Sequence, residues 1–171
     1  MKTKDIAMVA LMTVMICLCS WINIALFSIV PFTMQTFAIY CTLLLLGGKR
    51  GTIAMLLYIF MGTVGLPVFS GFNAGFGALL GPTGGFILGF LLCTLLYWLL
   101  ENHLNHVLLL VLGTLVCYAF GTAWFVQVYS SGGSPISIGA ALAACVLPFI
   151  IPDSAKLALA VVITRRIGKH I

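Results

Sequence analysis

Residues 148–156, PFIIPDSAK, place an acid and a base three positions apart inside an apolar region that runs from about residue 136 to 163. Asp153 and Lys156 are the only acid and the only base that lie deep within an apolar segment of this chain. An ionised group in a membrane costs about 2.5–3.5 kcal/mol on insertion scales, and it usually faces a partner or a water-filled cavity. The pair therefore predicts a ligand site, with a purely structural ion pair as the alternative.

On a helix, residues three apart share one face, so the two side chains are expected to lie together. Pro152 favours a helix start at Asp153, because proline fits the first turn, where its missing N–H costs little.

The composition indicates a protein that lies almost entirely in a membrane. Hydrophobic residues make up 63% of the chain and charged residues 6%, whereas soluble domains carry about 25% charged residues. We expect residues 1–171 to form a single all-α transmembrane domain in the cell membrane, crossing it several times. The net charge of +5 is scattered over the ends of apolar runs, which predicts topology signals and not a nucleic-acid surface.

Three common enzyme motifs are absent from the sequence. HExxH and GxSxG are absent, and GGKRG at 47–51 lacks the spacing of a phosphate-binding loop. The six cysteines all lie within apolar runs, where small buried hydrophobes are expected in place of metal ligands or disulfides. We therefore predict no catalytic residue, no cofactor, no metal and no ATP hydrolysis by this chain alone.

Hydropathy predicts six transmembrane helices, at about residues 5–28, 37–46, 52–65, 86–100, 107–129 and 153–166. Turns are expected at 31–35, 47–51 and 130–135, with a glycine-rich connection at 66–85. Six crossings with both termini in the cytoplasm place seven of the eight basic residues on the cytoplasmic side, as the positive-inside rule requires. Those seven are Lys2, Lys4, Lys49, Arg50, Arg165, Arg166 and Lys169.

This topology places the acid–base pair in the outer half of the membrane. Asp153 precedes Arg165 by 12 residues, or about 18 Å of helix, in an apolar core about 30 Å thick. The connection at 66–85 also lies outside, and its glycines would let it fold back over the site as a lid.

An outward cavity with aromatic side chains and few polar groups suits a small, partly apolar ligand. Asp153, Lys156, Asn73 and Gln35 supply hydrogen-bond donors and acceptors. The aromatic residues expected to cover an apolar ring are Phe32, Phe69, Phe72, Phe76 and Trp124.

Several motifs together resemble the BioY family. They are VPFTMQTFA at 30–38, LLGGKRG at 45–51, GLPVFSG at 65–71, LLGPTGGFILGF at 79–90 and LPFIIPDSAKLALA at 147–160. The combination covers nearly the whole chain and is specific, although each motif alone is weak.

The resemblance implies a biotin-binding S component of an energy-coupling-factor (ECF) transporter, with a six-helix fold and a vitamin pocket near the outer surface. It implies high-affinity biotin uptake together with a transmembrane coupling subunit and two cytosolic ATPases. Asn73, Asp153 and Lys156 match the family's polar pocket positions. The AxxxA pattern that often marks the docking helix of S components is not matched, because Leu11 follows Ala7 and Val14 follows Ala10. The alternatives are an S component for another vitamin and a carrier or channel that works alone.

Overall fold

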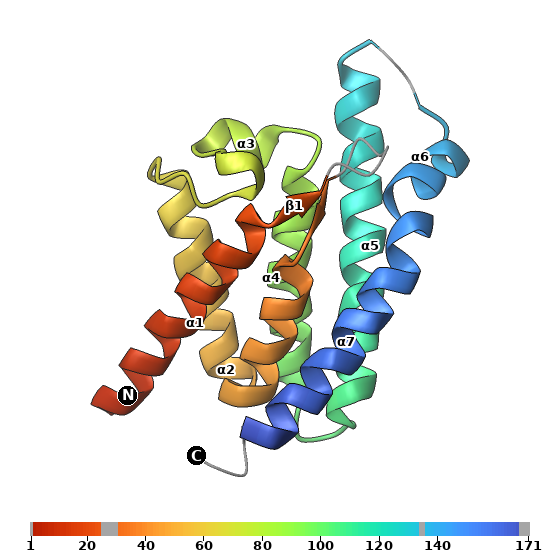
Figure 1. The fold of residues 1–171 in the computed structure, drawn as a ribbon. Helices are drawn as coiled ribbons and strands as arrows, with labels where there is room; N and C mark the ends of the chain where they lie inside the picture. Colours follow the sequence, from red (N-terminus) through yellow and green to blue (C-terminus); the bar gives the residue numbers. More distant parts are fainter. Residues whose placement is uncertain (1, 25–30, 134–135, 168–171) are drawn as a thin grey trace.

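The computed structural model describes residues 2–24, 31–133 and 136–167. These residues form a helical bundle with one small antiparallel ladder, which agrees with the predicted all-α class (Figure 1). The elements are α1 (Thr3–Trp21), β1 (Asn23–Ile24), β2 (Phe32–Thr33), α2 (Gln35–Thr63), the 3₁₀ turn η1 (Ser70–Phe72), α3 (Phe76–Leu80), α4 (Gly84–Leu100), α5 (His106–Ser131), α6 (Ile138–Cys145) and α7 (Leu147–Ile167).

The helices are apolar enough for a membrane protein. In the described part of the chain, α1, α5 and the α6–α7 segment each have the length and hydropathy of a membrane span, and α4 is an apolar helix of 17 residues. Helix α2 is equally apolar, but it reaches such a length only when its two halves are counted together. All six cysteines are buried and unbonded, as expected of small hydrophobic side chains.

Helix α2 consists of two helices joined at Gly47. This residue alone leaves helical geometry, with φ 76° and ψ 173°, a conformation that glycine adopts without strain. The two halves run in opposite directions (Figure 1), and a Cβ on Gly51 would lie 2.7 Å from Leu43 Cδ2 across the reversal. The predicted five-residue loop at 47–51 is therefore wrong, because one glycine makes the turn and residues 48–51 are already helical.

The end of the first helix also differs from the prediction. Helix α1 ends at Trp21, and Asn23–Ile24 pair with Phe32–Thr33. Residues 23–24 make backbone hydrogen bonds across the ladder in place of helical ones. The predicted helix is therefore wrong at these two residues. Its last part, residues 25–28, lies outside the described residues.

Pro152 does not start the last helix. Helix α7 begins at Leu147 and contains Pro152 in its interior, so the predicted break is wrong. Pro148 lies in the first turn, where its amide would have no partner. Pro152 follows four residues later, so the missing N–H removes only the bond to the Pro148 carbonyl. Asp153 consequently lies in the second turn of α7.

The remaining boundaries agree closely with the prediction. Helix α4 begins two residues before the predicted position, and α5 is longer by one residue at its start and two at its end. Helix α5 continues through residues 130–131 of the predicted turn, and residues 134–135 lie outside the described part. The connection at 66–85 contains η1 and α3, and residues 138–145 form α6.

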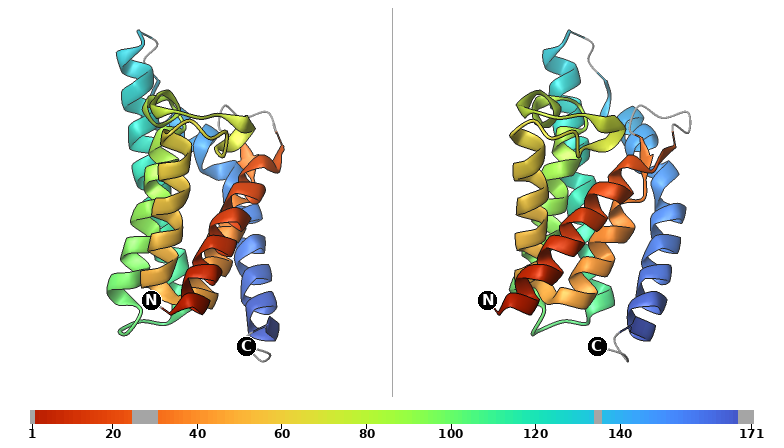
Figure 2. Two further views of the ribbon diagram at one scale, coloured as in Figure 1. Left: turned by 90° about the vertical axis from the view of Figure 1, so that its left-hand side faces the viewer. Right: turned by 60° about the vertical axis from the view of Figure 1, so that its left-hand side comes forward.

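The two ends of the bundle differ in charge. The N-terminus, the α2 reversal and the end of α7 share one end (Figure 1), where Arg50 Nη2 lies 3.1 Å from Asp5 Oδ1. The elements at this end carry six of the seven basic residues that were predicted to lie on the cytoplasmic side. The seventh, Lys169, is outside the described residues. The segment containing η1 and α3 crosses the opposite end (Figure 2).

Candidate functional site: a buried acid–base pair in a cavity

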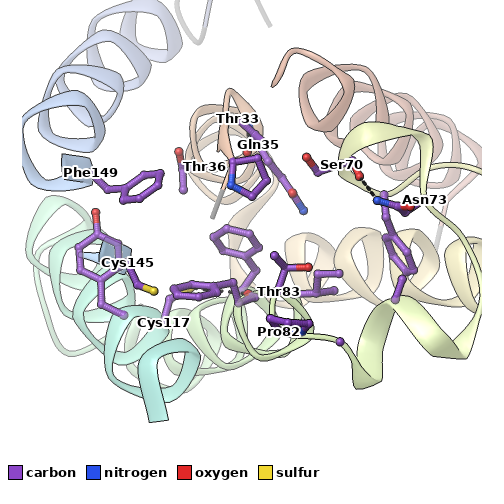
Figure 3. Close-up of a pocket in the computed structure, with 18 of the residues that line it drawn as sticks. Thr33, Gln35, Thr36, Ser70, Asn73, Pro82, Thr83, Cys117, Cys145 and Phe149 are labelled. Atoms are coloured by element: carbon purple, nitrogen blue, oxygen red, sulfur yellow. Dashed lines mark hydrogen bonds between the residues drawn. The ribbon is translucent and has the colours of Figure 1, made fainter. Parts of the chain in front are cut away.

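A cavity of about 390 Å³ lies between the helices, and α3 supplies part of its lining (Figure 3). This volume is typical of a small-molecule site. The walls come from the β2–α2 junction, the 69–83 segment, α4, α5, α6 and α7. The polar lining residues are Thr33, Gln35, Thr36, Ser70, Asn73, Thr83, Tyr118, Asp153 and Lys156. The aromatic walls are Phe69, Phe86, Phe90, Tyr118 and Phe149.

Asp153 and Lys156 form a buried ion pair in the wall of this cavity. Lys156 Nζ lies 2.7 Å from Asp153 Oδ1, and their side chains are 6% and 5% exposed. Thr36 Oγ1 donates to Oδ1 at 3.0 Å and Tyr118 Oη donates to Oδ2 at 2.6 Å. The carboxylate is thus held by donors from α2, α5 and α7, which fixes its position.

All three N–H donors of the Lys156 ammonium bond to groups of the protein itself. Besides Asp153, it donates to the Thr33 carbonyl at 2.7 Å and to Thr36 Oγ1 at 3.1 Å, and it lies 3.9 Å from the centroid of the Phe32 ring. An ammonium has three N–H donors, and a carboxylate accepts about four hydrogen bonds. The pair therefore offers the cavity no free N–H donor and one acceptor position, on Asp153 Oδ2.

Hydrogen bonds from the end of α1 hold the 66–75 segment beside the cavity. Ser20 Oγ donates to the Val68 carbonyl at 2.5 Å, and Trp21 Nε1 donates to the Pro67 carbonyl at 2.9 Å. Phe72 has a positive φ of 60° and stacks on Trp21 with ring centroids 5.1 Å apart. This segment supplies part of the cavity lining, and its role as a lid stays a prediction.

Four of the eight predicted ligand residues line the cavity. They are Gln35, Asn73, Asp153 and Lys156. Asn73 Nδ2 also donates to the Ser70 carbonyl at 2.8 Å, so part of that amide supports its own turn.

The structure does not bring the other four into the lining. Phe72 and Phe76 are 63% and 68% exposed. Phe32 packs behind the lining against Phe149, with ring centroids 6.3 Å apart. Trp124 Nε1 donates to the Gly81 carbonyl at 3.1 Å and therefore supports the wall from outside. Phe69, also expected as a cover, does line the cavity.

Sequence reasoning missed Thr36 and Tyr118, the two hydroxyls that hold Asp153. They are separated from it by 117 and 35 residues. The position of Thr36 beside Gln35 gave a weak signal, and nothing set Tyr118 apart from the other aromatic residues of the chain. The walls Phe86, Phe90 and Phe149 were likewise not singled out, because each lies in an ordinary apolar run.

A bundle of apolar helices around a cavity of this size, with a buried acid–base pair in its wall, defines a membrane protein that binds a small ligand. Comparisons with known proteins narrow this class. The model of the BioY family matches residues 1–171, and the chain belongs to that family.

Relatives of similar length support the assignment. The chain is 35% identical to the probable biotin transporter BioY of Pyrococcus horikoshii, over 98% of each protein. It is 33% identical to the biotin transporter BioY of Thermotoga maritima, over 97% of this chain and 96% of the relative. The structure also matches the crystal structure of an S-component for biotin from an ECF-type ABC transporter, with a TM-score of 0.84 and 29% identity, covering 98% of this chain and 92% of the other.

Proposed function

We propose that this chain is the substrate-binding subunit of a biotin transporter. It captures biotin from outside the cell and delivers it inward together with a transmembrane coupling subunit and two cytosolic ATPases. The observation that carries the proposal is the cavity of about 390 Å³ that holds the buried Asp153–Lys156 pair. The names of the relatives and of the matched structure support biotin as the ligand.

The lining suits the chemistry of biotin. Its cyclic urea offers two N–H donors and a carbonyl acceptor, and its thioether ring and aliphatic chain are apolar. Asp153 Oδ2 retains one acceptor position for an N–H of the urea, and the Asn73 amide provides a second polar contact at the 66–75 segment. Phe86, Phe90 and Phe149 offer apolar walls for the rest of the molecule.

The charge distribution supports one orientation in the cell membrane. The two halves of α2, together with α1, α4, α5 and the α6–α7 segment, provide six crossings. Positive residues collect on the cytoplasmic side, so the end with the termini and the Arg50–Asp5 pair lies inside. The cavity then lies toward the outer face, beneath the 66–75 segment.

The chain depends on partners for energy. Its GGKRG segment does not match a phosphate-binding loop, and nucleotide hydrolysis is assigned to the ATPase subunits. An S component for another vitamin and a carrier that works alone are the competing functions.

Uptake of radiolabelled biotin into right-side-out vesicles tests this assignment. Vesicles that contain this chain, the coupling subunit and both ATPases should accumulate biotin only when ATP is enclosed inside. Vesicles with this chain alone should accumulate none. Accumulation by the chain alone in ATP-depleted vesicles would show a stand-alone carrier, and a requirement for external ATP would contradict the orientation.

A further inference from the structure

The Gln35 side chain has an unusual environment in the cavity. Gln35 is 3% exposed, and its Nε2 has no hydrogen-bond partner among the described residues. A buried donor left without a partner costs about 1–3 kcal/mol, and most buried polar groups in native proteins avoid this cost. Gln35 also lines the cavity, and Figure 3 shows its amide reaching toward the enclosed space. The Nε2 atom itself is buried, so a rotation of the side-chain amide would bring this donor to a ligand in the cavity.

The donors around the Asp153–Lys156 pair are already committed. The three N–H groups of Lys156 go to Asp153, Thr36 and the Thr33 carbonyl. Thr36 and Tyr118 donate their hydroxyl hydrogens to Asp153. The polar groups around Asp153 therefore supply an acceptor and no free donor, so a ligand carbonyl needs a donor from elsewhere.

The local fold holds Gln35 in place. It is the first residue of α2, and the adjoining strand β2 pairs with β1. The backbone N–H of Met34 donates to the Ile22 carbonyl at 3.2 Å. Because the backbone on the N-terminal side of Gln35 is tied to the end of α1, its amide approaches the cavity from a fixed point.

We propose that Gln35 is a specificity-determining ligand contact, whose Nε2 donates to the carbonyl oxygen of a cyclic urea. Asp153 Oδ2 accepts an N–H of the same ring. This inference rests on the proposed function, since it assumes biotin in the cavity. The amide N–H can donate to the carbonyl oxygen of a urea. It finds no acceptor in a ring that carries N–H at that position. The site consequently selects a urea over a guanidine of the same shape.

Biotin and 2-iminobiotin provide the test, because 2-iminobiotin carries N–H where biotin has its carbonyl oxygen. Isothermal titration on the detergent-purified chain should show biotin binding weakened about 10- to 100-fold in Gln35→Met, the loss of one hydrogen bond to a buried group. Gln35→Glu should shift the ratio of the two affinities toward 2-iminobiotin, because a carboxylate accepts from the guanidinium.

Thr122→Val is the matched control. The Thr122 hydroxyl is also buried without a partner among the described residues, but it belongs to α5 and does not line the cavity. Its removal should leave the dissociation constant for biotin unchanged within about twofold.

The outcomes separate this inference from the proposed function. If the unmodified chain binds no biotin, both fail. If it binds biotin and both Gln35 variants keep its affinity and its preference over 2-iminobiotin, only the role of Gln35 is overturned. An equal loss for both ligands in both variants, with a lowered melting temperature, would assign Gln35 a structural role and also overturn the inference.

Discussion

Lys156→Met should abolish tight biotin binding and lower the free energy of unfolding by about 3–5 kcal/mol, the effect of leaving a buried charge without its partner. Asp153 would keep the donors Thr36 and Tyr118 but lose the ammonium at 2.7 Å. With Asp153 only 5% exposed, water cannot replace the missing charge. Thermal unfolding in detergent measures the stability, and isothermal titration measures the affinity.

The double variant Asp153→Asn/Lys156→Met separates the two effects. It removes both charges, so most of the lost stability should return, because replacing a complete buried pair by neutral groups is often tolerated. Binding should not return, since the ionised acceptor on Oδ2 is gone. Recovery of wild-type affinity in the double variant would show that the pair has a structural role only, and unchanged binding in Lys156→Met would contradict its role in holding Asp153.

The second large effect is expected at the GPTGG turn, in Gly84→Ala. A Cβ at this position would overlap the backbone carbonyl of Leu79, at the end of α3. The α3–α4 connection has to move, and overpacking of this kind costs about 1–3 kcal/mol or more. Because the same segment supplies lining residues between 77 and 83, biotin affinity should fall at least about tenfold, together with the melting temperature.

Gly139→Ala provides the control for this substitution. Gly139 is exposed in α6, and a Cβ there would meet no atom within 4 Å. Alanine has a higher helix propensity than glycine, and Gly139 lies in the first turn of α6, so this variant should be as stable as the unmodified chain or slightly more so. Equal stability and affinity in Gly84→Ala and Gly139→Ala would contradict the close packing of α3 against α4.

Local features of the fold could be predicted from the sequence. Apolar runs located the helices, and the spacing of Asp153 and Lys156 predicted their contact, because both depend on short separations along the chain. The errors arose where tertiary contacts outweigh local propensity. Pro152 was expected to start a helix, but α7 continues through it and lacks one backbone hydrogen bond there. At 47–51 a single glycine makes the turn for which a five-residue loop was expected.

The cavity was predictable only in part, for a related reason. The polar residues Gln35 and Asn73 stood out in apolar surroundings and do line it. The aromatic residues did not stand out, since Phe72, Phe76 and Phe90 look alike in sequence and only Phe90 faces the cavity. Which face of a helix lines a cavity depends on how helices far apart in the chain pack, as the contact between Tyr118 and Asp153 shows.

The most direct test of the account is an isothermal titration of biotin into the detergent-purified chain alone, with thiamine as the comparison ligand. Biotin should bind tightly at one site per chain, thiamine should not bind, and the biotin signal should be lost in Asp153→Asn. A chain that stays folded and binds no biotin, or an Asp153→Asn variant that binds as tightly as the unmodified chain, would contradict the claim that this cavity is a biotin site.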